Sequence, residues 1–417
     1  MATNSNHPWL QINTTVPMSY IIGILLFVGV TSSFISDMYV PSLPNIMLAF
    51  TASRSLVQWT ITAYLLGLSF PQLIYGPVSD KIGRRPVVIF GLSLALFGSV
   101  LCLFANSISI LILGRLIQGI GVSAALVLSR SVFRDLFHGE HLARLGSYLA
   151  LAFAVGPAIA PVLGGYLEVW VGWRGSFGFI LFYIALALLL IYYVLPETNQ
   201  QLNPKAFHPK QMLVNYKEIA SNFNFIGNTV VTTAAISGIM VFYTMSPFIM
   251  QTVLGMSPAK YGLTTLALTV IAIVGRSLNA ILLKQVEYKR LIILGLILML
   301  ISACSMLFIG FIGVLTSLAV VIPMMGFVLG TSLVLPNAFA AALTPFSRMA
   351  GTAGALYGAL QTFGSFIITA IAACFHVRNQ TMLALILVAT TVLALSVYYY
   401  GERRNSELLP GLEEITS

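Results

Sequence analysis

The sequence predicts an all-α polytopic membrane protein, with twelve transmembrane helices in two pseudo-symmetric six-helix halves. The 417-residue chain is 58% hydrophobic and has a mean hydropathy of +0.94, more apolar surface than a soluble domain needs. Its apolar runs reach the roughly 20 residues that a helix needs to cross a bilayer. The runs are continuous, as in residues 184–191, whereas the strands of a membrane barrel alternate apolar and polar residues. Continuous runs therefore favour helices.

The predicted spans follow one another with short polar segments between them. Residues 1–195 form the N-terminal half, and residues 223–400 form the C-terminal half. Residues 196–222, the longest polar segment, form a cytoplasmic linker, and residues 401–417 form a cytoplasmic tail. The twelve spans are 17–40, 55–75, 86–105, 109–130, 142–166, 174–195, 223–249, 258–282, 289–313, 315–343, 351–375 and 379–400.

A faint internal repeat relates the two halves at an offset of about 204 residues. Arg85 falls on Lys289, and Tyr39 falls on Tyr243. Two parallel six-helix repeats are typical of transporters, in which the substrate binds near the membrane midplane between the halves. Phosphate-binding loops, zinc-ligand spacings and Ser/His/Asp arrangements are absent from the sequence, so we expect neither an enzyme nor a cofactor or metal.

The net charge of +9 fits cytoplasmic loops that obey the positive-inside rule. With both termini in the cytoplasm, most of the 21 Lys and Arg residues lie on the cytoplasmic side. No segment is long enough to form a soluble basic face for nucleic acid, and no basic region precedes the first apolar run as in a signal peptide. On the opposite side fall only Arg54, Arg174, Lys260 and Arg378.

Asp37, near the end of the first span, is the only one of the 12 acidic residues that we expect at membrane depth. The other acids fall in predicted loops, at helix ends or in the tail. A carboxyl group at such depth can load and lose a proton near neutral pH, so we predict that Asp37 carries protons and recognises cationic groups. The alternative is a polar helix end at the outer interface, because the helix from Tyr20 to Asp37 rises about 25 Å.

The most charged stretch, residues 76–85, lies between the second and third spans. Gly76, Asp80, Gly83, Arg84 and Arg85 predict a tight cytoplasmic hairpin, which we call the cytoplasmic latch. We expect Asp80 to lie at a helix N-terminus or to pair with a cation across the interface of the halves. A generic positive-inside turn is the alternative. The pattern G-x-x-x-D-[KR]-x-G-[RK]-[RK] resembles the signature loop of the major facilitator superfamily, which implies the fold of that family.

The fourth span contains Arg115, Gln118, Gly119 and Gly121, which resemble the R-x-x-Q-G-x-G motif of the same superfamily. An arginine inside the membrane costs about 2.5–3.5 kcal/mol on insertion scales, so it should face the bundle interior and have a partner. The resemblance implies a role for Arg115 in proton coupling. Snorkelling to an interface is the alternative. At the end of this span, we expect Arg134 and Asp135 to form a cytoplasmic ion pair.

The fifth span contains a run of proline and glycine that resembles the antiporter motif of the superfamily. Proline removes a helical hydrogen bond and glycine removes a side chain, so we expect a kinked helix that packs closely against its neighbour. An ordinary kinked membrane helix is the alternative. The residues are Gly156, Pro157, Pro161, Gly164 and Gly165.

Taken together, the motifs resemble the bicyclomycin-resistance and chloramphenicol-efflux branch of bacterial drug:proton antiporters. The resemblance implies a monomer in the bacterial inner membrane, surrounded by lipid, that exports a small amphiphilic molecule in exchange for protons. An importer of a metabolite or siderophore without antiport and a non-transporting sensor are the alternatives. The residues expected to line the substrate cavity are Asp37, Tyr64, Gln118, Tyr243, Tyr357 and Gln361.

Overall fold

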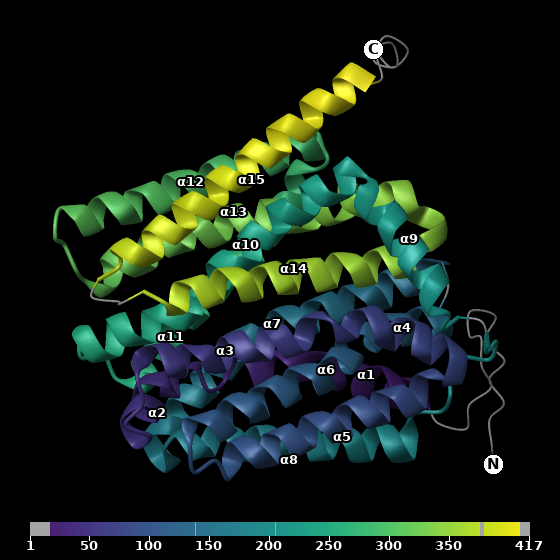
Figure 1. The fold of residues 1–417 in the computed structure, drawn as a ribbon, viewed down its shortest axis with the longest axis horizontal. Helices are drawn as coiled ribbons and strands as arrows, with labels where there is room; N and C mark the ends of the chain where they lie inside the picture. The colour runs from purple at the N-terminus through teal and green to yellow at the C-terminus, as the bar shows by residue number, and fades with distance from the viewer. Residues whose placement is uncertain (1–16, 138, 205, 376–378, 409–417) are drawn as a thin grey trace. The chain divides into compact units, whose positions relative to one another are not determined.

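The computed structural model describes residues 17–137, 139–204, 206–375 and 379–408, and these ranges contain helices but no strand (Figure 1). The predicted all-α fold is therefore confirmed. The first eight helices are α1 Met18–Asp37, α2 Leu43–Ala49, α3 Arg54–Ser69, α4 Pro71–Ile82, α5 Arg84–Leu103, α6 Ile108–Leu136, α7 Gly139–Val171 and α8 Trp173–Val194. The remaining helices are α9 Pro209–Ser221, α10 Phe223–Pro247, α11 Pro258–Leu282, α12 Tyr288–Phe311, α13 Ser317–Leu343, α14 Ala350–Ala373 and α15 Thr381–Leu408.

Nine segments of the described residues are long and apolar enough to cross a membrane by length and composition, so the chain is a multi-pass membrane protein. One of them, Ser317–Ala373, comprises both α13 and α14, which the 3₁₀ helix η3 Thr344–Met349 joins. Shorter helices make up other predicted spans, since α3 and α4 follow each other with only Phe70 between them.

Short polar side chains start several of the long helices. Ser53, Ser107, Asn222 and Thr316 each precede a helix, and each side-chain oxygen accepts a hydrogen bond from a backbone N–H three residues later. Such caps satisfy one of the four N–H groups that a helix leaves without an internal partner. These residues explain where α3, α6, α10 and α13 begin.

The charged stretch at residues 76–85 is helical and not an open hairpin loop. α4 continues to Ile82, α5 begins at Arg84, and only Gly83 lies between them, with a φ of 107°. Glycine adopts this conformation without steric cost, so the chain reverses at a single residue. The charged side chains therefore project from the ends of two helices, which corrects the prediction that these spans stop at residue 75 and resume at residue 86.

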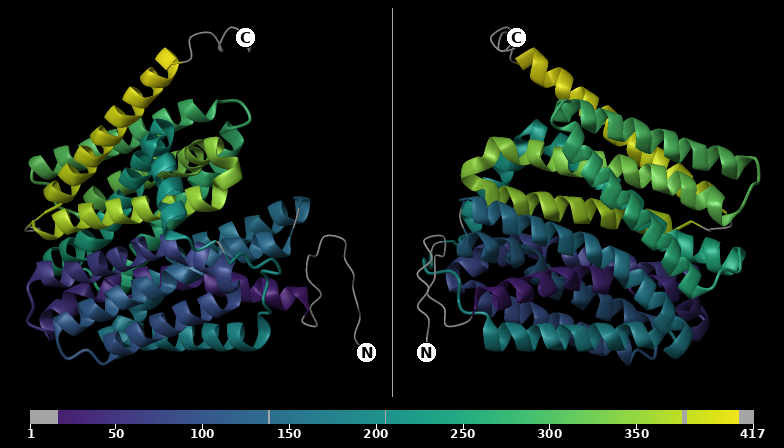
Figure 2. Two further views of the ribbon diagram at one scale, coloured as in Figure 1. Left: turned by 45° about the vertical axis from the view of Figure 1, so that its right-hand side comes forward. Right: turned by 180° about the vertical axis from the view of Figure 1, so that it is seen from behind.

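The helices form two compact units, each of which is described on its own. The first comprises the described part of Met1–Pro209 together with Gly255–Thr269, so the beginning of α11 belongs to it. In this unit α6 packs against α3 and α5, and α5 lies beside α8 (Figures 1 and 2). Gly119 and Gly121 of α6 leave no room for a Cβ, because α3 and α5 lie against them at the Tyr64 carbonyl and at Ala95.

The second unit comprises the described part of Lys210–Leu254 and Val270–Ser417. Here α10 packs against α13, α14 and α15, and α12 packs against α13 and α15 (Figure 2).

The first membrane helix of each half changes its helical form near its end. α1 passes through the 3₁₀ helix η1 Val40–Ser42 into α2, and α10 passes into the π-helix η2 Phe248–Val253. Both irregularities follow the tyrosines, Tyr39 and Tyr243, that the predicted repeat aligns.

Candidate functional site

Asp37 lies at a break inside the first membrane segment. The α-helix ends at this residue, and the chain continues through η1 and α2 to Ala49 within one apolar segment, Ser19–Ala49, of 31 residues. The side chain is buried, and Asp37 Oδ1 accepts a hydrogen bond of 2.5 Å from Ser36 Oγ. Asp37 is therefore an internal, buried carboxylate with further helix beyond it, which argues against the alternative of a helix end at the interface.

Arg115 is fully buried in α6 and held almost entirely by uncharged groups. Its Nη1 donates to the Ile35 carbonyl at 2.7 Å and to Gln118 Oε1 at 2.8 Å. The guanidinium lies against two tyrosine rings, 4.2 Å from the centroid of Tyr39 and 4.5 Å from that of Tyr64. Contacts of this kind stabilise a desolvated cation by about 2 kcal/mol. Arg115 therefore faces the bundle interior and does not snorkel to an interface.

The charges of Arg115 and Asp37 attract each other, yet no ion pair within 4.0 Å joins these two described side chains. The nearest bond from Arg115 to the Asp37 region goes to the carbonyl of Ile35, two residues earlier. One guanidinium nitrogen, Nη2, is buried without a hydrogen-bond partner. The cluster therefore keeps a carboxylate and a donor available instead of joining them to each other.

Besides Asp37, two of the predicted cavity residues belong to this cluster. Gln118 accepts from Arg115 and donates through Nε2 to Ser99 Oγ at 2.8 Å, and Tyr64 Oη lies 3.2 Å from Ser32 Oγ. Both are buried, so they position Arg115 within the first unit. The sequence indicates Tyr39 only as the counterpart of Tyr243 in the repeat, and its contact with Arg115 was not predicted.

The other predicted cavity residues belong to the second unit. Tyr243 is buried in α10. Tyr357 of α14 is buried against the rings of Phe225 and Phe339, and Gln361, one turn later, is partly exposed. Their role in substrate binding stays a prediction.

The glycines of α7 bring backbone against backbone, as the motif predicts. A Cβ on Gly164 would overlap the Met38 carbonyl, and one on Gly156 would lie 2.6 Å from Ser33 Cβ. On another face, a Cβ on Gly165 would lie 2.5 Å from the Pro258 carbonyl at the start of α11. Gly262 of α11 makes the reciprocal close contact, since a Cβ on this residue would lie 2.5 Å from the Pro161 carbonyl of α7. Pro157 and Pro161 both lie inside the continuous helix α7.

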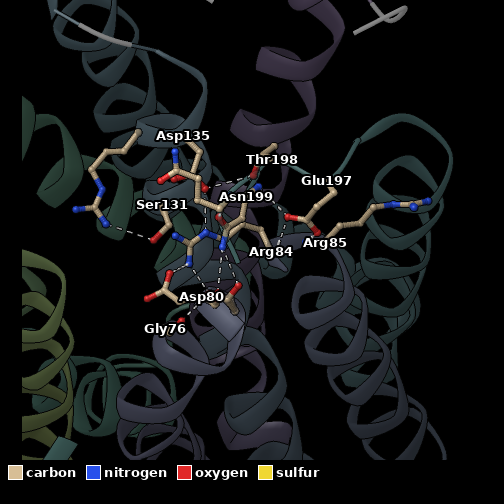
Figure 3. A network of polar contacts seen from close by, with 12 residues as sticks. Gly76, Asp80, Arg84, Arg85, Ser131, Asp135, Glu197, Thr198 and Asn199 are labelled. Atoms are coloured by element: carbon tan, nitrogen blue, oxygen red, sulfur yellow. Dashed lines mark hydrogen bonds and ion pairs between the residues drawn. The ribbon is translucent and has the colours of Figure 1, made fainter. Parts of the chain in front are cut away.

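The charged stretch forms a network within the first unit (Figure 3). Arg84 is buried, its Nη1 lies 2.6 Å from Asp80 Oδ1, and its Nε donates to Asp135 Oδ2 at 2.9 Å. Asp135 comes from the end of α6 and pairs with Arg84, whereas Arg134 donates to Ser131 Oγ at 3.4 Å. The predicted ion pair between Arg134 and Asp135 is therefore wrong, because the Asp135 carboxylate pairs with Arg84 instead.

Glu197 completes this network, and sequence reasoning missed it. Its two carboxylate oxygens accept hydrogen bonds from the backbone N–H groups of Arg84 at 2.8 Å and Arg85 at 3.1 Å (Figure 3). Glu197, and not Asp80, is the anion at the N-terminus of α5. The linker follows α4 further, since Asn203 N donates to the Asp80 carbonyl at 3.0 Å. A carboxylate directly after Pro196, at the end of a span, was the only sequence signal.

Gly76 plays a smaller structural part than its place in the motif suggests. A Cβ on Gly76 would meet no described atom within 4 Å, so close packing does not explain this glycine. Gly83, in contrast, is required by its positive φ.

Glu168, which the sequence assigned to a helix end, is a second buried carboxylate of the first unit. It lies on α7 one turn after Gly164, and its Oε1 accepts a hydrogen bond of 2.5 Å from Asn45 Nδ2 of α2. Asp37 is therefore not the only buried acid in an apolar segment. The burial of Glu168 could not be predicted from its place near a helix end, because it depends on the tertiary contact between α7 and α2.

Comparison with known proteins agrees with this architecture. Residues 25–369 match the family model described as Major Facilitator Superfamily. The chain is 28% identical to "Multidrug resistance protein D" of Escherichia coli, over 84% of this chain and 87% of that protein. It is 30% identical to "Uncharacterized MFS-type transporter YdgK" of Bacillus subtilis, over 93% of this chain and 96% of that protein. It is 25% identical to "Bicyclomycin resistance protein homolog" of Haemophilus influenzae, over 88% of this chain and 92% of that protein.

Among solved structures, the fold is similar to that of a D-xylose-proton symporter, with a TM-score of 0.76 at 18% identity, over 91% of this chain and 97% of that chain. At this identity the likeness concerns the fold alone. The family match covers most of the chain and includes most of α1, all of α2 to α13 and most of α14. The sequence motifs, the helical fold and this match together show that the chain belongs to the Major Facilitator Superfamily.

Proposed function

We propose that this protein is a secondary active transporter that exports a small amphiphilic compound by proton antiport with alternating access. Relatives named for multidrug resistance and for bicyclomycin resistance support export of such compounds. Their bacterial origin and the distribution of Lys and Arg support a place in the bacterial inner membrane with both termini in the cytoplasm. The proton gradient supplies the energy.

The observation that carries this proposal is the buried Asp37 carboxylate beside an Arg115 that rings and carbonyls already hold. Because Arg115 is not consumed in an ion pair with Asp37, the carboxylate can exchange a proton for a cationic group of the substrate. Protonation of Asp37 favours one facing state, and substrate binding displaces the proton. Arg115 stays charged and sets the electrostatic environment in which Asp37 titrates.

The test uses the full-length protein in proteoliposomes with an imposed pH gradient. A compound screen that measures proton release from the purified protein first identifies a substrate. Asp37→Asn should keep the elution profile and unfolding temperature of the parent but lose proton-driven efflux. The matched control Glu287→Gln changes an exposed carboxylate and should transport as the parent does.

Undiminished efflux by D37N against a pH gradient would refute the role of Asp37. Substrate uptake that needs no proton counterflow would indicate an importer, and binding without flux would indicate a sensor. Either result would overturn the proposed antiport, whatever the effect of the substitution.

A further inference from the structure

The contact between α7 and α2 contains an acid that the proposed mechanism does not use. Glu168 is 6% exposed, and one of its oxygens, Oε1, accepts the hydrogen bond from Asn45. The other oxygen, Oε2, is buried without a hydrogen-bond partner. A buried carboxylate with one unpartnered oxygen is costly in its charged form, because nothing replaces the water that it has lost.

A second buried polar group lies near this carboxylate. The hydroxyl of Ser42, in η1, lies near the Glu168 carboxylate, and it is also buried without completing a hydrogen bond. A proton on Oε2 would turn that oxygen into a donor, and Ser42 Oγ can accept from it. Because the Ser42 hydroxyl can also donate, it can pair with Glu168 in either protonation state, and the case for a proton rests on the buried, unpaired charge that the proton removes.

Among the side chains that the structure describes, no charged group pairs with the Glu168 carboxylate. η1 and α2 carry no charged residue. The charged side chains that the other neighbouring elements contribute do not form an ion pair with Glu168 among the described residues. The hydroxyls of Tyr39 and Tyr183 are hydrogen-bonded to Thr60 and to the Phe27 carbonyl. The charged residues of these elements whose side chains the structure describes are Asp37 of α1, Arg115, Arg134 and Asp135 of α6, Arg174 of α8, and Lys260 at the start of α11.

We propose that Glu168 is a second proton-binding site of this protein, and that its proton strengthens the attachment of α7 to the turn formed by residues 38–45. α7 contacts both ends of this turn. Gly164 lies against the Met38 carbonyl at its beginning, and Glu168 accepts a hydrogen bond from Asn45 at its end. Asp37 directly precedes the turn. A proton at Glu168 thus acts on the backbone segment that begins at Asp37, about one helical turn of α7 away from the Gly164 contact.

The proposal is independent of the role of Asp37, and infrared difference spectroscopy separates the two. The full-length protein in nanodiscs is titrated with pH, and the C=O band of protonated carboxyl groups is followed. We expect a titrating band that persists in Asp37→Asn and is lost in Glu168→Gln. The matched control Glu287→Gln should retain it.

Glu168→Asp keeps a carboxyl group but shortens its reach, so its band should move in frequency and titration midpoint. The protection of the amides in residues 38–45, taken as the exchange rate relative to the intrinsic rate at each pH, should depend on pH in the parent and lose that dependence in E168Q. A band unchanged in both E168Q and E168D would overturn the proposal, and so would amide protection that depends on pH equally in the parent and in E168Q. Under the proposed function, the parent shows a second titrating component, from Asp37, that is lost in D37N; the absence of such a component would count against the proposed function and not against this site.

Discussion

The cap that Glu197 places on α5 predicts a local loss of stability that can be measured. Arg84 and Arg85 occupy the first two positions of α5, and their N–H groups have no acceptor within the helix. Both donate to the Glu197 carboxylate, at 2.8 Å and 3.1 Å. Loss of a helix cap costs about 0.5–2 kcal/mol, with about 1 kcal/mol typical. Because Glu197 is exposed, we expect Glu197→Ala to cost about 1 kcal/mol, in the middle of that range.

Hydrogen exchange followed by mass spectrometry measures this effect where it arises. A local cost of about 1–2 kcal/mol corresponds to about 5–30-fold faster opening of the helix end. For the expected cost of about 1 kcal/mol, peptides that contain residues 84–87 should therefore exchange about 5-fold faster. Peptides from the middle of α5 should be unaffected, because a cap acts on the first turn.

Glu287 supplies the matched control, since it stands at the N-cap of α12, where the predicted repeat places the counterpart of the charged stretch. Its side chain makes no capping hydrogen bond. Glu287→Ala should therefore leave exchange at the first turn of α12 unchanged. Equal effects of E197A and E287A, or no effect of E197A, would refute the inference that Glu197 caps α5.

Two further predictions concern the stability of the first unit in detergent, measured as unfolding temperature. Gly164→Ala should lower it, because the added methyl group would overlap the Met38 carbonyl, whereas Gly76→Ala should leave it unchanged or raise it slightly; equal temperatures would contradict the packing described for α7. Asp135→Asn should destabilise the protein by about 1–3 kcal/mol, because Asp135 accepts from the buried Arg84 and is mostly shielded from solvent. Asp80→Asn should have the smaller effect because 47% of its side chain is exposed, and the opposite order would contradict this ranking.

The helical fold could be predicted because lipid imposes a simple rule on the sequence. Apolar runs of span length predict helices, and α11 has the bounds that its apolar run predicts, Pro258–Leu282. The same rule failed at Ile82, where the helix continues through charged residues. Hydropathy reports where the apolar environment ends, while a helix ends where a residue such as Gly83 changes the backbone direction.

The candidate site was predictable where its members share one helix. Arg115 and Gln118 are three residues apart on α6, so their contact follows from helical spacing. Glu168 and Glu197 were missed because their partners, Asn45 and Arg84, are more than 100 residues away in the chain. A single sequence contains no signal for such distant contacts, and both acids resemble ordinary polar residues at helix ends.

The way in which Arg115 is held has an electrical consequence. Tyrosine rings and carbonyl groups stabilise its charge without neutralising it, so the cluster with Asp37 is neutral when the carboxylate is charged. Under the proposed function, one proton changes the cluster to a net charge of +1. The membrane potential acts on such a charge with about 2.3 kcal/mol per 100 mV if the charge crosses the whole field. Voltage and the pH gradient would then both bias the transport cycle, each through the same buried pair of residues.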